Sequence, residues 1–295
     1  EDTTPKKKIT PVTIGIIAGA AVVLLLGGFY LYKVMARGKV DALVHQLTSP
    51  DIAQRKEAED ELAKRSSNSR LVAEVLYENL AIYAGDKQDM EELFKGLLMK
   101  IGDDHTVDVV SEGLADPQTD RYTRKASIQI LSQIRKESAA RVLAGLLDHE
   151  DEAEDAMNGL ITIGSVALPP LQEAMKHKDP AVRKRAVLAM GRIADEAAQP
   201  SLAEALKDED AEVRMAAITY LPDVGGDGLL DLLLEALEDE NEEVRQQAII
   251  HLETHADASA VEPIIGALDD SSARVRAMAA KILGNLGDKR AMDPL

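Results

Sequence analysis

The chain of 295 residues contains no cysteine and no tryptophan, and only 3% of its residues are aromatic. Without cysteine it has no disulfides, no cysteine zinc ligands and no thiol nucleophile. The low aromatic content argues against a β-sandwich and against an aromatic-lined pocket for a small molecule. The lack of cysteine is compatible with either side of a membrane.

The 34 basic residues are outnumbered by 52 acidic ones, which gives a formal net charge of −18. Contacts with nucleic-acid phosphates require a basic stripe, so the acidic balance argues against a nucleic-acid partner. The sequence also lacks the glycine-rich phosphate-binding patterns GxxxxGK[ST] and GxGxxG and the nucleophile pattern GxSxG. We therefore expect no cofactor and no enzymatic activity.

A repeated dipeptide, Val-Arg, organises the second half of the chain. Each copy lies 31 residues after the one before: Val182-Arg183, Val213-Arg214, Val244-Arg245 and Val275-Arg276. A fixed period between 20 and 50 residues is typical of a solenoid, which stacks one supersecondary unit repeatedly.

Apolar residues recur at fixed distances from each of these arginines. Three and seven residues on lie Ala186, Ala217, Ala248 and Ala279, and Met190, Leu221, Leu252 and Leu283; nineteen residues on lie Leu202, Leu233, Ile264 and Leu295. These offsets define one apolar face on each of two helices. A single helix pair cannot bury such a face alone, so the units are expected to stack. The predicted fold is an all-α solenoid of antiparallel helix pairs.

An aspartate precedes each of the last three arginines by six residues, giving Asp208 and Arg214, Asp239 and Arg245, and Asp270 and Arg276. With these residues the chain resembles the HEAT repeat, in the short form also found in phycobilisome-lyase-type proteins. The resemblance implies a structural ladder of these six residues between neighbouring units. It also implies that the second helix of each unit lines the concave side. Exposed pairs of this kind would each contribute only about 0–1 kcal/mol.

Residues 12–32, VTIGIIAGAAVVLLLGGFYLY, carry no charge. A helix of this length spans about 30 Å, the thickness of the hydrocarbon core of a bilayer. Lysines flank both ends, and tyrosines lie at the second end. The run therefore predicts a single transmembrane helix, with a buried core helix and a cleaved signal peptide as the disfavoured alternatives.

Within this predicted helix, Gly15 and Gly19 form a GxxxG pattern, which permits close contact between helices in lipid. A homo-oligomer held through Gly15 and Gly19 is a hypothesis that follows. The short basic tail before the span favours placing the repeats on the periplasmic or extracytoplasmic side.

These patterns divide the chain into five segments. They are a polar tail (1–11), the transmembrane helix (12–32), a linker with a degenerate first repeat (33–68), divergent helical repeats (69–166), and regular repeats (167–295). In the divergent segment we expect the arginine column to hold Glu154 or Asp155. The last repeat is truncated at Leu295, so we expect the natural chain to continue.

Two histidines, His251 and His255, lie four residues apart on one predicted helix face. One interpretation is half of a metal site or a pH-sensitive joint. The other is a pair of hydrogen-bonded histidines at a helix end. No third ligand is evident, and Glu253 is one position away from the HExxH arrangement.

The sequence therefore favours a membrane-anchored scaffold or assembly protein, whose partners are proteins of a membrane complex and whose repeats bind them through the second helices. The predicted binding residues on those helices are Arg185, Leu188, Arg192, Thr219, Gln247, Ile250, Met278 and Lys281. A structural subunit of a large membrane complex and a lyase- or hydroxylase-like enzyme of the same superfamily are the alternatives.

Overall fold

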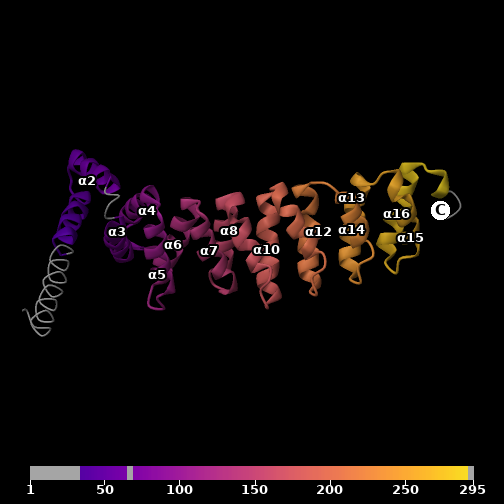
Figure 1. The fold of residues 1–295 in the computed structure, drawn as a ribbon, viewed down its shortest axis with the longest axis horizontal. Helices are drawn as coiled ribbons and strands as arrows, with labels where there is room; N and C mark the ends of the chain where they lie inside the picture. Colours follow the sequence, from indigo (N-terminus) through magenta and orange to yellow (C-terminus); the bar gives the residue numbers. More distant parts are fainter. Residues whose placement is uncertain (1–33, 65–68, 292–295) are drawn as a thin grey trace, which may run out of the picture. The chain divides into compact units, whose positions relative to one another are not determined.

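The protein is described in a computed structural model over residues 34–64 and 69–291 (Figure 1). In these ranges it is helical and has no β-strand. The chain forms two compact units, of which unit 1 ends at Val109 and unit 2 begins at Val110. The all-α prediction is confirmed for the described residues.

Unit 1 consists of a helix over residues 34–47 and the helices that follow it. These are α2 (Ile52–Lys64), α3 (Ser69–Tyr83), α4 (Gln88–Ile101) and the first half of α5 (Asp104–Ala115). Helices α3 and α4 pack against each other, and α4 also packs against α2. The rings of Tyr83 and Phe94 stack between α3 and α4, with their centroids 5.9 Å apart.

Three residues at the start of unit 1, in the segment of the predicted degenerate repeat, are buried. Leu47, Ala58 and Leu62 are at most 1% exposed. Asp51 caps the start of helix α2, because its side chain accepts a hydrogen bond from the backbone N–H of Ala53 at 2.8 Å.

Unit 2 is a stack of antiparallel helix pairs (Figure 1). Its first helices are α7 (Glu137–Gly145), α9 (Leu168–Ala174), α11 (Gln199–Ala205), α13 (Leu229–Ala236) and α15 (Val261–Gly266). Its second helices are α6 (Arg121–Ile134), α8 (Ala153–Ile163), α10 (Pro180–Ile193), α12 (Ala211–Val224), α14 (Glu242–His255) and α16 (Ala273–Leu286).

The repeated apolar columns form the core of unit 2. The four alanines of the first column, Ala186, Ala217, Ala248 and Ala279, are all 0% exposed. Leucine, isoleucine and methionine side chains of the other columns fill the space between the pairs, and those within the described residues are at most 1% exposed. The column prediction is confirmed for these residues.

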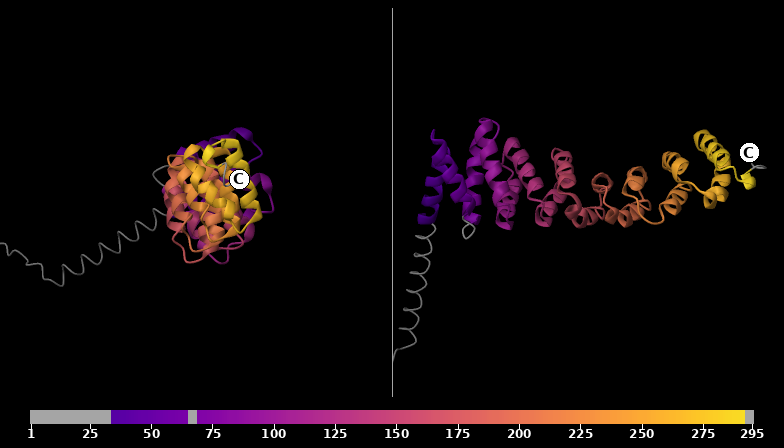
Figure 2. Two further views of the ribbon diagram at one scale, coloured as in Figure 1. Left: turned by 90° about the vertical axis from the view of Figure 1, so that its right-hand side faces the viewer. Right: turned by 90° about the horizontal axis from the view of Figure 1, so that it is seen from above.

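Successive second helices pack directly against one another, from α6 through α8, α10, α12 and α14 to α16. From α9 onwards, successive first helices make much less contact with each other. The right-hand view of Figure 2 shows the helices of unit 2 following one another in sequence order. The second helices therefore form one continuous surface, called here the second-helix face.

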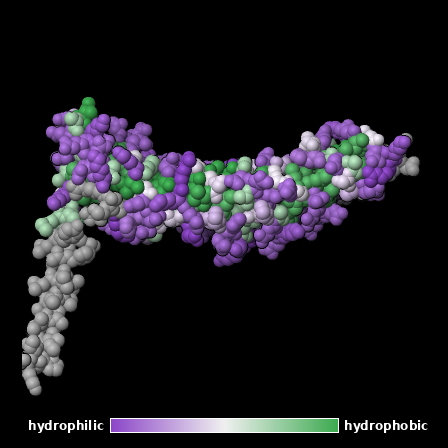
Figure 3. Space-filling model, turned by 45° about the horizontal axis from the view of Figure 1, so that its top comes forward, coloured by the Kyte–Doolittle hydropathy of each residue, from purple (hydrophilic) through white to green (hydrophobic). Residues whose placement is uncertain are grey.

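The predicted membrane span, residues 12–32, lies outside the described residues. Among residues 34–64 and 69–291, no helix combines the length and the apolar character needed to cross a bilayer. On the side of the molecule drawn in Figure 3, hydrophilic residues cover most of the described surface, and hydrophobic residues occupy smaller areas between them.

One close approach between second helices depends on a glycine. Gly191 in α10 lies under the ring of Tyr220 in α12, and a Cβ atom at Gly191 would overlap the Cβ and Cγ atoms of Tyr220. Gly284 in α16 stands at the same repeat position three units later, but a Cβ atom there would have no atom within 4 Å.

We expect Gly191→Ala to lower the free energy of unfolding by about 1–3 kcal/mol, because overpacking forces the α10–α12 joint apart. The matched variant Gly284→Ala should raise it by about 0.5–1 kcal/mol, because alanine is the better helix former and has room. Urea unfolding followed by circular dichroism measures both. Equal effects of the two substitutions would contradict the close packing of Gly191 against Tyr220.

Candidate functional site

A buried ladder of arginines and aspartates joins successive helix pairs at the turns that lead into the second helices. Arg214 in α12 shows its geometry. Its Nε and Nη2 atoms donate to the two carboxylate oxygens of Asp239 in the next unit, at 2.8 and 3.0 Å. Its Nη1 atom donates to the backbone carbonyl of Asp208 in its own unit, at 2.8 Å. One guanidinium therefore holds two successive turns.

The same arrangement recurs along the regular repeats. Arg183 holds Asp208 at 2.8 Å, and Arg245 holds Asp270 at 2.7 and 3.1 Å. Arg276 donates to the carbonyl of Asp270 at 2.7 Å and has no carboxylate partner within the described residues. Each aspartate thus uses its carboxylate for the arginine 25 residues earlier and its carbonyl for the arginine six residues later.

The ladder is largely shielded from water. The arginine side chains that hold carboxylates are 7–11% exposed, and their aspartates are 9–13% exposed. Hydrogen bonds from Arg245 hold the pKa of Asp270 below its ordinary value. Since the pairs are bidentate and buried, the small free energy expected for an exposed pair does not apply to them.

The ladder is interrupted at α8, and the predicted residues at its arginine column are corrected here. Ala153, which is 2% exposed, occupies that column, whereas Glu154 and Asp155 are exposed. The reason is a shorter turn, because Ala153 lies five residues after Asp148, whereas each arginine of the regular repeats lies six residues after its aspartate. Arg185 of α10 replaces the missing contact in part, because its Nη1 donates to the carbonyl of Leu147 at 2.7 Å.

The predicted binding residues of α10 to α16 lie on the second-helix face, and several already have partners within the chain. Besides the contact of Arg185, Lys281 pairs with Glu253 at 2.6 Å, and Thr219 donates to the carbonyl of Met215 at 2.7 Å. Leu188, Ile250 and Met278 are half-buried, and Arg192 is exposed.

The two candidate metal-binding histidines are each engaged in local hydrogen bonds. The side-chain amide of Gln247 lies 2.9 Å from His251 Nε2, and His255 Nδ1 lies 2.8 Å from the carbonyl oxygen of His251. Burial, and to a smaller extent His255, lowers the pKa of His251. Among the described residues, no group of three or more histidines, aspartates and glutamates could hold a metal ion.

A groove lies on the second-helix face between α6 and α8. It consists of two adjoining cavities of about 470 and 160 Å³, which share Lys125, Ile128 and Asp155. The larger one extends to the beginnings of the two helices, at Arg121 and Asp151. The smaller one continues along the helices past Asn158 and Thr162.

The sequence prediction missed this groove, although the residue columns contain its signal. Lys125, Ile128 and Ser132 stand 30 residues before Asp155, Asn158 and Thr162. These in turn stand 30 residues before the predicted binding residues Arg185, Leu188 and Arg192. A search for repeats at a spacing of 31 residues alone does not align α6, α8 and α10 with one another.

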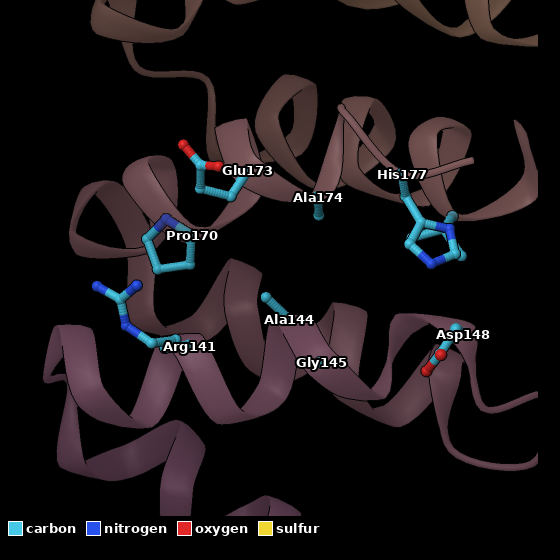
Figure 4. Close-up of a pocket in the computed structure, with 9 residues that line it drawn as sticks. Arg141, Ala144, Gly145, Asp148, Pro170, Glu173, Ala174 and His177 are labelled. Atoms are coloured by element: carbon cyan, nitrogen blue, oxygen red, sulfur yellow. The ribbon is translucent and has the colours of Figure 1, made fainter. Parts of the chain in front are cut away.

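A second hollow, of about 290 Å³, lies between the first helices α7 and α9 (Figure 4). Arg141 and Glu173 lie toward one end of it, and Asp148 and His177 lie toward the other. Small residues such as Ala144 and Ala174 line its middle. Arg141 is already paired with Glu137 at 2.7 Å, and His177 accepts a hydrogen bond from the backbone N–H of Asp179 at 3.1 Å.

Comparison with protein families supports the repeat assignment. Residues 153–222 and 230–295 match the family described as HEAT repeats. In this part of unit 2 the chain is therefore similar to HEAT repeats. No curated protein sequence matches the chain significantly.

Several solved structures are similar to the chain. An engineered protein is 22% identical, with 86% of this chain and 80% of that chain covered and a TM-score of 0.39. Human deoxyhypusine hydroxylase in complex with glycerol is 18% identical, with 87% and 99% covered and a TM-score of 0.35. A Kap121p mutant is 12% identical, with 84% and 33% covered and a TM-score of 0.47. Similarity at this level does not transfer an activity to the chain.

We expect Asp239→Ala to lower the free energy of unfolding by about 3 kcal/mol, because it leaves the guanidinium of Arg214 buried without its carboxylate. Glu240→Ala is the matched control. Its side chain also contacts Arg214 but is 84% exposed, so its loss should cost less than about 1 kcal/mol. Urea unfolding monitored by circular dichroism compares them, and a similar loss in both variants would contradict a buried ladder.

Proposed function

We propose that the protein is a membrane-tethered scaffold that binds partner proteins through the second-helix face and has no catalytic role. The observation that carries this proposal is the continuity of that face, in which six second helices pack side by side. The buried ladder fixes the register of the regular units within it. A partner would therefore meet a preformed surface, which limits the entropy lost on binding.

The chemistry of the face also suits a protein partner. Leu188, Ile250 and Met278 offer half-buried apolar groups, and polar residues such as Arg192 and Thr254 lie exposed beside them. Protein interfaces combine apolar contact regions with a polar rim in this way. A HEAT-repeat solenoid is a typical support for such a surface.

The tether in this proposal is the uncharged segment 12–32, which is long enough to span a bilayer as a helix. It would place unit 2 beside other membrane proteins, so the proposed partners belong to a membrane complex. The basic residues before the segment favour an extracytoplasmic position for the repeats. Gly15 and Gly19 would allow two copies to associate through the tether.

Partner binding is tested by placing a photo-crosslinking amino acid at Arg192 or at Thr254 in the full chain, in membranes of the native cell. We expect both positions to give the same crosslinked partner, because both side chains are exposed on the second-helix face. Glu204 and Glu262 are the controls, since they are exposed on the first helices α11 and α15. Crosslinks of equal yield from the control positions, or none from the face, would contradict the proposed binding surface.

The tether is tested by alkaline carbonate extraction of native membranes. The full chain should stay in the membrane pellet, because a spanning helix is not released by high pH. A chain lacking residues 12–32 should appear in the supernatant with unchanged helical content. Release of the full chain by carbonate would refute the transmembrane tether.

A further inference from the structure

The groove between α6 and α8 has walls of opposite charge. Arg121 and Lys125 line it from α6, and Asp151 and Asp155 line it from the α8 side. All four are exposed, and none of them forms an ion pair with another described residue. Opposite charges therefore face the same hollow without meeting across it.

An ion pair between Arg124 and Glu152 closes one part of this groove and leaves the rest open. Arg124 of α6 pairs with Glu152, which immediately precedes α8, and its Nη1 donates to the carbonyl of Leu114 at 2.7 Å. Hydrogen bonds from Arg124 hold the pKa of Glu152 below its ordinary value. This pair, about 15–19% exposed, joins the two walls. The neighbouring charges stay available to a ligand.

The shape and chemistry of the groove favour an extended peptide. Neighbouring residues of an extended strand point to opposite sides, so one acidic and one basic residue in succession would reach opposite walls. The groove continues from the charged cavity into the smaller one, where the side-chain amide of Asn158 offers both a donor and an acceptor to a peptide group. The amide has no partner among the described residues.

We propose that this groove binds an extended segment of a partner protein in which an acidic residue and a basic residue are adjacent. The acidic side chain lies against Arg121 and Lys125, and the basic side chain lies against Asp151 and Asp155. This inference rests on the proposed scaffold function and specifies the sequence pattern that one part of the second-helix face recognises.

The test uses two fluorescent ten-residue peptides of the same composition in a serine and glycine background. One carries Glu-Lys as neighbours, and the other carries Glu-Ser-Lys, which places both charges on the same side of a strand. Fluorescence anisotropy with the full chain should show about three- to tenfold tighter binding of the first peptide. Salt at about 0.5 M should reduce the difference, because exposed ion pairs are screened.

Charge variants of the two walls should change the preference in opposite directions. Lys125→Glu makes the α6 wall more acidic, so binding should shift toward a Lys-Lys peptide. Asp155→Lys makes the α8 wall more basic, so binding should shift toward a Glu-Glu peptide. Lys178→Glu is the matched control, since Lys178 is exposed and lies outside the groove. It should leave the preference unchanged, and circular dichroism checks that every variant is folded.

Equal affinity for the two isomeric peptides, or the same shift in Lys178→Glu as in Lys125→Glu, would overturn the assignment. Full competition by a free amino acid at millimolar concentration would overturn it in favour of a small zwitterion. In either case, crosslinks from Arg192 and Thr254 would show that the scaffold function stands without this groove. If the chain with an unmodified groove gives no crosslinks from Arg192 and Thr254, the scaffold proposal itself fails.

Discussion

The bidentate contact between an arginine of one repeat and an aspartate of the next is the interaction on which unit 2 depends. Repeats of this kind touch only their neighbours, so each joint must set its own register. Alanine columns let the second helices approach, but a row of alanines and leucines permits small slips along the helix axes. A guanidinium that binds a carboxylate of the next unit and a carbonyl of its own unit prevents such slips, because both hydrogen-bonding directions are fixed.

This contact also divides the second-helix face into a part that is tied by the ladder and a part that is not. The regular joints from α10 to α16 are tied by the ladder and close-packed. At α8 the arginine column holds Ala153, and the repeat spacing is 30 residues. There the links between neighbouring units are the pair of Arg124 with Glu152 and the hydrogen bond of Arg185 to Leu147. The groove between α6 and α8 lies in the part of unit 2 that precedes the ladder, whose first bidentate contact is that of Arg183 with Asp208.

The sequence was sufficient to predict the helix pairs and the buried columns, because periodic alanines and leucines depend only on local spacing. It also pointed to five residues of the bidentate ladder, but it left out Arg183 and included Arg276, which among the described residues binds backbone carbonyls only. The partner of each carboxylate was visible only in three dimensions. Asp208 is six residues from Arg214 along the chain, yet its carboxylate binds Arg183. The α6–α8 groove could not be predicted from a spacing of 31, and charged side chains line a hollow only once their neighbours are placed. Residues 12–32 lie outside the described part of the chain, so the membrane span stays a prediction.

The most direct measurement of the ladder is a double-mutant cycle on Arg214 and Asp239. The free energy of unfolding is measured for Arg214→Met, for Asp239→Ala and for the chain with both substitutions. If the buried pair fixes the joint, the two effects couple by about 1.5 kcal/mol or more, and the double variant is hardly less stable than either single one. Coupling within about 0.5 kcal/mol of zero would contradict this account, because the two side chains would then act independently.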